Sequence, residues 1–270
     1  VVVTGQLTPL SVVTGHARPG VEIIDASHGD HGQELTHASR AKLVVQAAKD
    51  HPGGRIVRLM DGDPTIFNGL AEEAQACRRA GIVIDIVPGV SAVTAVPAYA
   101  GVPLTSPACS SVVVISAGSS AVDYHHATAD SVSVVLLGGA RELAIGLASL
   151  AEAGRAGTTP VALIERGTTT EQHTVVTTIE RAATVVAELG HPSLAIVGPT
   201  VALHDQLAWF ESKPLFGWKV LVPRTKEQST PVTGALAAHG ACGVVVPTIS
   251  VEPPRTRHQM DKAIHGLITF

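Results

Sequence analysis

Residues 194–222 read LAIVGPTVALHDQLAWFESKPLFGWKVLV. An apolar strand ends at Gly198, a short helix is expected to end at residues 209–211, and Lys213-Pro214 then breaks the chain. A second apolar strand, residues 218–222, begins directly after the break. This pattern predicts that two α/β units meet here, one on each side of the break.

Apolar runs alternate with helical patterns on both sides of this junction. The expected strands are 1–3, 21–24, 55–60, 82–87, 111–116, 132–137, 160–164, 173–178, 193–197, 218–222 and 243–247. The expected helices are 39–49, 69–80, 91–100, 140–153, 180–189, 231–239 and 256–267. An alternating order of strands and helices predicts a mostly parallel sheet that is covered on both faces. Residues 117–130 are small and polar and are expected to form a loop.

The composition limits the class of protein. Hydrophobic residues make up 45% of the chain but aromatic residues only 3%, so small and β-branched side chains must fill the cores. A net charge of −4 argues against a broad nucleic-acid-binding surface. The three cysteines are far apart and form no CxxC pair, which favours a reducing cytoplasm over a disulfide framework. No apolar run reaches the roughly 18–20 residues that span a bilayer. We therefore expect neither nucleic acid nor membrane as a partner.

Segments at three expected strand ends have the composition of ligand-binding turns. In open parallel sheets, ligands bind beyond the carboxyl ends of the strands. Residues 58–67 combine a glycine with a proline, residues 87–93 begin a helix whose first N–H groups lack helical partners, and residues 163–169 end in glycine and hydroxyl side chains. Each segment alone is more often a plain turn. Together, and in this order, they predict one ligand-binding crevice.

The same segments resemble a known family. Residues 57–67, VRLMDGDPTIF, resemble the VRLKGGDPFIF loop of uroporphyrinogen-III C-methyltransferases, and residues 86–92, IVPGVSA, resemble its VVPGITA motif. Residues 98–105, AYAGVPLT, are similar to AYAGIPLT, and residues 167–172, GTTTEQ, resemble its GTTxQ motif. The resemblance covers residues 1–212. It implies methyl transfer from S-adenosylmethionine to pyrrole carbons of uroporphyrinogen III, which gives precorrin-2 for sirohaem and cobalamin synthesis.

This resemblance also implies a fold and a domain organisation. The expected fold class is α/β, with open sheets in two subdomains of the tetrapyrrole-methylase type, followed by the first part of a second doubly wound α/β domain. Residues 1–105 would form the N-terminal methylase subdomain, without its first strand and loop. Residues 106–200 would form the C-terminal subdomain, and residues 201–217 a linker. Residues 218–270 would begin the second domain.

The second domain resembles the start of uroporphyrinogen-III synthase. The resemblance lies in the first strand and the Val222-Pro-Arg-Thr225 segment that follows it, and in residues 247–254, which are similar to the segment that crosses between the two domains of that family. It implies a bifunctional tetrapyrrole enzyme of the actinobacterial type, because the synthase closes hydroxymethylbilane to the substrate of the methylase.

Site residues follow from the resemblance by position. The residues expected to bind the cofactor are Asp61, Gly62, Asp63, Ile66, Ser91, Ala92, Leu137 and Gly167. The substrate is rich in carboxylates, so arginines are candidate substrate-binding residues through bidentate pairing, although a structural role is common for such side chains: Arg58, Arg166 and, in the synthase-like part, Arg224. No catalytic residue is assigned. The expected partners are the tetrapyrrole substrate and a second copy of the chain, because this methylase family is commonly dimeric.

Several positions depart from the family pattern. Asp61 replaces a glycine, an aspartate proposed as a base falls on Thr4 or Gly5, and a lysine proposed as an acid is missing from residues 24–27. The family's first glycine-rich loop is expected to precede Val1. We expect the sequence to be a fragment at both ends. These departures leave two alternatives open. One is a catalytically silent module that scaffolds the synthase, and the other is a related methyltransferase that acts on a different acceptor.

Clusters of titratable residues have simpler interpretations. The histidines considered as metal ligands are His28, His31, His37 and the pair His125-His126. They show neither HExxH spacing nor a cysteine partner, so exposed loop histidines are the simpler interpretation and no metal is expected. Glu72 and Glu73 lie in the first turn of an expected helix, where the helix dipole accounts for them better than acid–base chemistry does.

Overall fold

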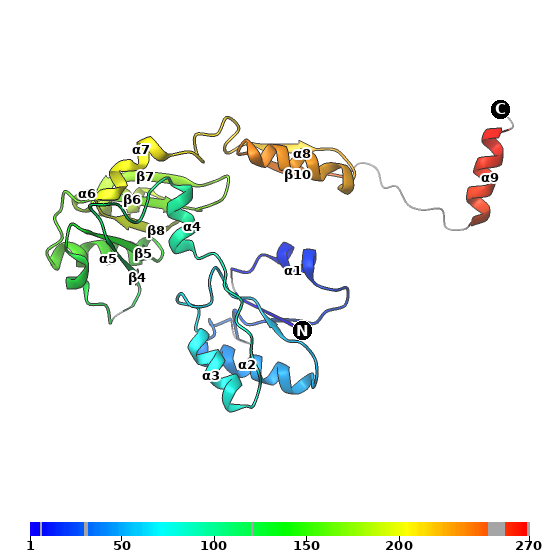
Figure 1. The fold of residues 1–270 in the computed structure, drawn as a ribbon, viewed down its shortest axis with the longest axis horizontal. Helices are drawn as coiled ribbons and strands as arrows, with labels where there is room; N and C mark the ends of the chain where they lie inside the picture. Colours follow the sequence, from blue (N-terminus) through cyan, green and yellow to red (C-terminus); the bar gives the residue numbers. More distant parts are fainter. Residues whose placement is uncertain (6, 30–31, 120, 248–256, 269–270) are drawn as a thin grey trace.

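The computed structural model describes residues 1–5, 7–29, 32–119, 121–247 and 257–268 (Figure 1). The first sheet contains β1 (Val2–Thr4), β2 (Ile23–Asp25) and β3 (Val57–Arg58) in the parallel order β2-β1-β3. Its helices are α1 (Leu10–His16), α2 (His37–Asp50) and α3 (Leu70–Arg79). Because β1 lies between β2 and β3, the strand order reverses at β1. The carboxyl ends of β1 and β3 therefore flank a switch point, where such sheets bind ligands.

The second sheet has the order β4-β5-β8-β6-β7. Its strands are β4 (Ser111–Ser116), β5 (Val132–Leu137), β6 (Pro160–Glu165), β7 (His173–Thr178) and β8 (Pro192–Val197). Side chains alternate between its two faces, as the pleat requires. One face packs against α5 (Ala140–Glu152) and α6 (Ile179–Glu188), and the other against α4 (Ala92–Tyr99). The second sheet is thus covered by helices on both faces.

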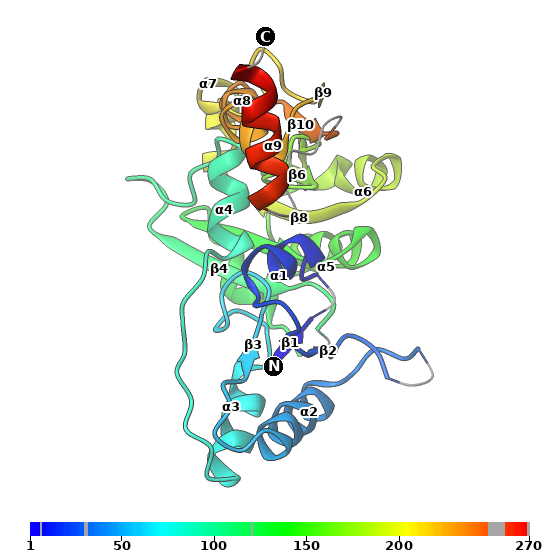
Figure 2. The same cartoon turned by 90° about the vertical axis from the view of Figure 1, so that its right-hand side faces the viewer.

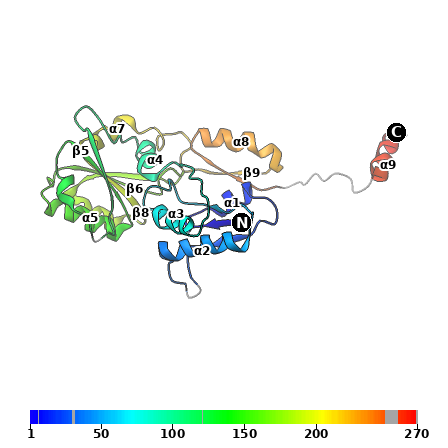
Figure 3. The same ribbon diagram turned by 60° about the horizontal axis from the view of Figure 1, so that its bottom comes forward.

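A linker and a third unit follow the second sheet. The linker contains the 3-10 helix η2 (Pro199–Leu203) and the short helix α7 (His204–Leu207). The third unit pairs β9 (Lys219–Val222) in parallel with β10 (Cys242–Val245), with α8 (Lys226–Ala238) between them in sequence. Figure 3 shows α8 beside β9. The helix α9 (Arg257–Ile268) is the last described element. No helix in the described part of the chain is both long and apolar enough to cross a bilayer.

The α/β fold with open sheets is confirmed, and many element limits agree with the sequence. The expected strands 111–116, 132–137 and 173–178 match β4, β5 and β7 residue for residue. The loop 117–130 contains one 3-10 turn, η1 (Tyr124–Ala127). These agreements come from runs of β-branched residues bounded by turn residues.

Other expectations were wrong. Residues 82–87 form no strand but an extended segment in which Val83 is 93% and Val87 77% exposed, and this segment pairs with no strand of the sheets in the described part of the chain. Figure 2 shows this segment running along the first unit from α3 towards α4. The second sheet is not mostly parallel: β4 and β5 are parallel, whereas β8 is antiparallel to β5 and β6, and β6 to β7. The connection 166–172 is too short for the crossover that parallel neighbours need.

The helices depart most from expectation in three places. The sequence missed α1, which is short and contains β-branched residues and a glycine. The helix expected over 231–239 begins at Lys226, because the Thr225 hydroxyl accepts from Gln228 N and caps the helix ahead of Pro231. The helix expected to end at 209–211 ends at Leu207.

Candidate functional site

The switch point of the first sheet brings Gly5, Arg58 and Asp61 together. A Cβ added at Gly5 would lie 3.5 Å from Asp61 Oδ2 and 3.6 Å from Arg58 Nη1. The Gly5 amide donates to the Thr8 hydroxyl (3.1 Å), and this bond shapes the turn that follows β1. Gly5 was not assigned a site role from the sequence. Its position directly after the first apolar strand is the signal that would have identified it.

The 61–63 turn lies against the start of α4. Gly62 has a φ of 62°, and a Cβ added there would lie 3.4 Å from Ser91 Cα. A Cβ at Gly89 would lie only 2.0 Å from the Gly62 carbonyl oxygen. Ser91 caps α4, since its hydroxyl accepts from Val93 N at 3.2 Å. Two of the three predicted turns are therefore in direct backbone contact.

Asp63 ties these two turns together through its carboxylate. Its Oδ2 accepts from Gly89 N at 3.0 Å, and its Oδ1 accepts from Thr65 N at 2.8 Å and from the Thr65 hydroxyl. These hydrogen bonds, led by those from Thr65, lower the pKa of Asp63 below its ordinary value of 3.8. Asn68 Nδ2 donates to the carbonyls of Asp61 and Asp63, both at 2.6 Å. The turn is thus held by its own polar groups.

The third predicted turn contacts α4 from the second sheet. A Cβ added at Gly167 would lie 2.6 Å from Cγ2 and 2.7 Å from Cγ1 of Val96. Arg166 and Thr168, on either side, have φ angles of 44° and 69°, in the left-handed region that β-branched and long side chains avoid. Since Ser91 begins α4 and Val96 lies within it, one helix contacts both the 61–63 turn and the 166–168 turn.

Ile66 and Leu137 belong to one apolar cluster beneath α4. Both pack against a buried group that includes Val93 and Val96. Leu137 and Ile164 each pair with Leu194 of β8, so the carboxyl ends of β5 and β6 lie on either side of that strand. Most of the residues predicted to bind the cofactor thus lie in α4, against it or in the apolar cluster beneath it, whereas Asp61 lies beside Gly5.

The three candidate arginines have different surroundings. Arg58 Nε donates to Glu73 Oε2 at 3.1 Å in an ion pair whose side chains are 12% and 5% exposed. Arg166 pairs with Glu171 at the surface, and Glu171 also bonds Lys219 Nζ at 2.6 Å. Arg224 is exposed in the third unit, between β9 and α8, and is not part of the α4 arrangement.

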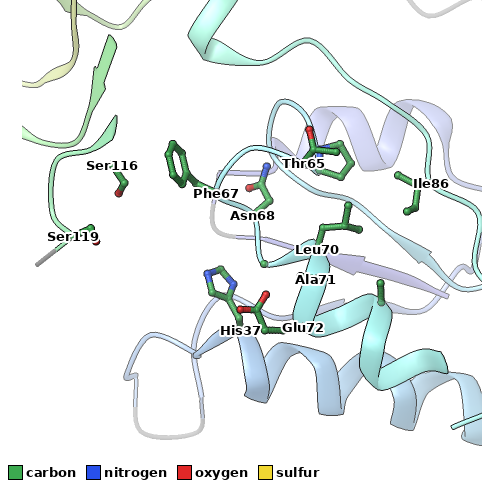
Figure 4. A pocket seen from close by; sticks show the side chains of 13 residues that line it. His37, Thr65, Phe67, Asn68, Leu70, Ala71, Glu72, Ile86, Ser116 and Ser119 are labelled. Atoms are coloured by element: carbon green, nitrogen blue, oxygen red, sulfur yellow. The ribbon is translucent and has the colours of Figure 1, made fainter. Parts of the chain in front are cut away.

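A cavity of about 700 Å³ lies beside these turns, between the first unit and the end of β4 (Figure 4). Its walls include His37, Phe67 and Glu72 from the first unit and Ser116 and Ser119 from the second. A second cavity shares His37 and Phe67. Both are formed by described residues, and from the predicted segments they include Pro64, Thr65 and Phe67 of residues 57–67 and Ile86 of residues 86–92. The sequence did not predict that these residues line one cavity, because they come from parts of the chain that are far apart.

The histidines are dispersed. His126 Nε2 lies 3.4 Å from Asp123 Oδ2 in an exposed pair between η1 and the residue that caps its start. His37 lines the cavity, and its Nδ1 is buried without a hydrogen-bond partner. His31 lies outside the described residues, as do residues 248–256. In the part of the chain that the structure describes, no three histidine, cysteine, aspartate or glutamate side chains gather as a metal site would require.

Comparison with known proteins gives matches over most of the chain. A model of the family Tetrapyrrole (Corrin/Porphyrin) Methylases matches residues 1–183. Siroheme synthase 1 of Klebsiella pneumoniae is 38% identical over 175 residues, covering 63% of this chain and 37% of the relative. Porphyrin biosynthesis protein HemD of Ruminiclostridium josui is 33% identical over 214 residues, covering 76% of this chain and 42% of the relative. The chain therefore spans about two fifths of the length of these relatives.

A solved structure gives a similar result for the fold. Uroporphyrin-III C-methyl transferase from Thermus thermophilus, complexed with S-adenyl homocysteine, superimposes with a TM-score of 0.60 at 25% sequence identity. The match covers 75% of this chain and 86% of that chain.

Proposed function

The chain belongs to the tetrapyrrole methylase family, and we propose that it transfers methyl groups from S-adenosylmethionine to pyrrole carbons of uroporphyrinogen III, giving precorrin-2. The names of its relatives, siroheme synthase and uroporphyrin-III C-methyl transferase, support this choice of substrate. The ligand of the Thermus enzyme supports the cofactor, because it is the methyl donor after loss of its methyl group. The product would serve sirohaem and cobalamin synthesis.

The position of α4 carries this proposal. Gly62 lies against the first residues of α4, and Gly167 lies against Val96. A ligand at this end of the helix would be flanked by turns from both sheets. Methyl transfer depends on such an arrangement, because holding donor and acceptor in line supplies much of the rate.

The residues present fit a nucleoside that approaches the backbone closely. A side chain at Gly89 would collide with the Gly62 carbonyl, and Gly62 itself adopts a conformation that favours glycine. At these two glycines the turns therefore meet through peptide groups rather than side chains. We assign the cofactor to the residues expected from the sequence: Asp61, Gly62, Asp63, Ile66, Ser91, Ala92, Leu137 and Gly167.

When bound, the cofactor supplies an electrophilic methyl group on a sulfonium sulfur. The residues of the chain then bind and orient. Ile66 and Leu137 present apolar surface from the cluster beneath α4 and exclude water there. The Asp63 carboxylate already accepts from Thr65 and Gly89, so it fixes the turn rather than receiving a proton. A pyrrole carbon is electron-rich and needs little activation, and no catalytic residue is assigned.

Arginines are proposed to bind the carboxylates of the substrate. Arg166 is 53% exposed and its partner Glu171 is a surface residue, so a substrate carboxylate can exchange with that partner. A carboxylate can reach Arg58 only by displacing Glu73 from a buried pair. Arg166 is therefore the stronger of the two assignments.

The third unit is proposed to begin a uroporphyrinogen-III synthase domain. Residues 218–225 support this by resemblance, and Arg224 would then meet a substrate of that domain. The subdomain limits 1–105 and 106–200, the linker 201–217 and the domain start at 218 are part of the same proposal, as are a homodimer and a cytoplasmic location.

A catalytically silent scaffold is the second candidate. Asp61 favours it, since its carboxylate replaces a family glycine and lies beside Gly5 at the switch point. If this side chain obstructs the cofactor, Asp61→Gly should raise the affinity for S-adenosylhomocysteine. An unchanged affinity would remove the argument for obstruction.

Calorimetry with S-adenosylhomocysteine on the full-length protein tests the cofactor. Measurable binding is expected, and its absence leaves the scaffold. A methylation assay with uroporphyrinogen III, followed by the absorbance of oxidised precorrin-2, then tests the acceptor. Binding without methylation of this acceptor would favour a related methyltransferase.

A further inference from the structure

The turn at residues 166–168 adopts a backbone conformation that its own residues disfavour. Arg166 and Thr168 have φ angles of 44° and 69°. Such conformations persist only where surrounding contacts impose them, and they concentrate at functional sites. The contacts that impose this one should therefore control the shape of the turn.

Gln172 supplies the main contact. Its side chain is buried, with 3% of its surface exposed, and its Oε1 accepts from the Thr168 backbone N–H at 2.7 Å. The Thr169 hydroxyl closes the same turn by donating to the Arg166 carbonyl at 2.7 Å. The Thr168 amide is thus fixed from inside the protein.

The Glu211 side chain forms a hydrogen bond with Gln172 and fixes its position. Its Oε1 accepts from Gln172 Nε2 at 2.8 Å and from the Thr174 hydroxyl at 2.5 Å, and its Oε2 accepts from Thr174 N at 3.2 Å. With both ends of the Gln172 amide occupied, its orientation is fixed with the oxygen towards Thr168. The bonds form a relay, Glu211–Gln172–Thr168, which we call the turn relay.

Glu211 comes from the linker, beyond the residues that the family model matches. The linker is itself anchored on α4, since Trp209 Nε1 donates to the Ala98 carbonyl at 2.9 Å and the Tyr99 and Phe210 rings pack edge to face with centroids 4.6 Å apart. The linker that carries the Glu211 carboxylate is therefore anchored on α4, the helix that Gly167 contacts.

We propose that Gln172 and Glu211 are positioning residues, which set the Gly167–Thr168 backbone that receives the cofactor. The assignment of that turn to the cofactor rests on the proposed function, but the relay itself does not. Its consequence is that the linker completes the site of the methylase part, so the junction does more than connect two units.

Exchanging the two side-chain groups tests the relay. Gln172→Glu places a second carboxylate against Glu211, and Glu211→Gln places an amide N–H₂ against one of two donors, the Gln172 amide N–H₂ or the Thr174 N–H. In the double variant, a carboxylate at 172 can accept from Thr168 N while the amide at 211 donates to it and accepts from Thr174 N. Gln46→Glu is the matched control, because Gln46 Nε2 bonds Asp50 Oδ1 at the same 2.8 Å on α2, away from the turn.

Three measurements separate positioning from folding: affinity for S-adenosylhomocysteine, hydrogen exchange of the Thr168 amide, and the melting temperature. We expect Gln172→Glu to weaken the affinity at least about tenfold and to accelerate exchange, because the new carboxylate cannot donate to Glu211 and is repelled by it, so the acceptor of the Thr168 N–H is no longer held in place. The double variant should recover both to within about threefold of the parent, and the Gln46 control should change neither.

Additive losses in the double variant, or unchanged exchange in Gln172→Glu, would overturn the relay. If Gln172→Glu alone does not fold, a folded double variant with parental exchange still demonstrates the coupling, and an unfolded one refutes it. If the parent protein binds no S-adenosylhomocysteine, the proposed function fails, while the exchange data still decide whether Gln172 and Glu211 hold the turn.

Discussion

Gly167→Ala is a sharp test of the contact between the 166–168 turn and α4. An added Cβ would lie 2.6 Å and 2.7 Å from the Val96 methyl groups and 3.1 Å from Val96 Cβ. Rotation of the Val96 side chain cannot remove the clash, since Cβ itself is too close. The φ angle of Gly167 lies outside the left-handed region, so the penalty is steric alone.

The size of the effect follows from these distances. Carbon atoms pack best about 3.5–4.0 Å apart, so the turn or α4 must move by about 1 Å. Overpacking of this kind typically destabilises a protein by about 1–3 kcal/mol. The melting temperature should fall by about 2–4 °C for each kcal/mol. Because the displaced turn is the proposed cofactor contact, the affinity for S-adenosylhomocysteine should fall as well.

Calorimetry and thermal unfolding on four variants check this reasoning: Gly167→Ala, Val96→Ala, the double variant and Gly15→Ala. Val96→Ala removes both methyl groups, so Gly167→Ala should lose less affinity in that background than in the parent. Gly15→Ala is the control, because a Cβ there meets no atom within 4 Å. Unaltered stability and affinity in Gly167→Ala, or an equal loss in the Val96→Ala background, would show that the turn does not rest on α4 as described.

Three further outcomes follow from other contacts. Arg58→Met should lower the free energy of unfolding by about 3–5 kcal/mol in chemical denaturation, because it leaves Glu73 buried without its partner; adding Glu73→Leu should recover most of that loss, and a parental value for Arg58→Met would contradict the pairing. The pKa of Asp63 is lowered in the folded state, so its contribution to stability is present above its ordinary pKa of 3.8 and disappears as the pH falls through the lower folded value; Asp63→Asn should flatten the acid side of a plot of melting temperature against pH, and an unchanged slope would exclude the carboxylate as a source. Trp209→Phe retains a ring but loses the bond to the Ala98 carbonyl, and should cost about 1 kcal/mol in the same denaturation assay; no loss would mean that the indole N–H does not anchor the linker.

Local patterns predicted the strand limits of the second sheet well, but not its antiparallel pairings. Runs such as residues 111–116 and 132–137 are β-branched and end in turn residues, so their limits could be read directly. The same reasoning failed for 82–87, whose composition is equally strand-like. Composition indicates that a segment favours an extended backbone, but a strand also needs a neighbouring edge, and that depends on distant residues.

In the candidate site, too, the local segments were predicted from the sequence, whereas the contacts between them were not. Short motifs identified the 61–63, 89–92 and 167–172 segments, because glycine, proline and capping residues act within a few positions. The contact of Gly89 with Gly62 and the bond from Gln172 to Glu211 join residues far apart in sequence. No local spacing encodes such contacts, and they emerge only once α4 and the linker are packed.

The ring contacts around the linker have a practical consequence. Trp209 and Trp218 are the only two tryptophans in the chain, and both flank the break at Lys213, whose ammonium lies 4.9 Å from the Trp209 ring. Indole emission from these 270 residues therefore originates entirely from the two sides of this break. Intrinsic fluorescence can follow the opening or docking of that region in solution without any attached dye.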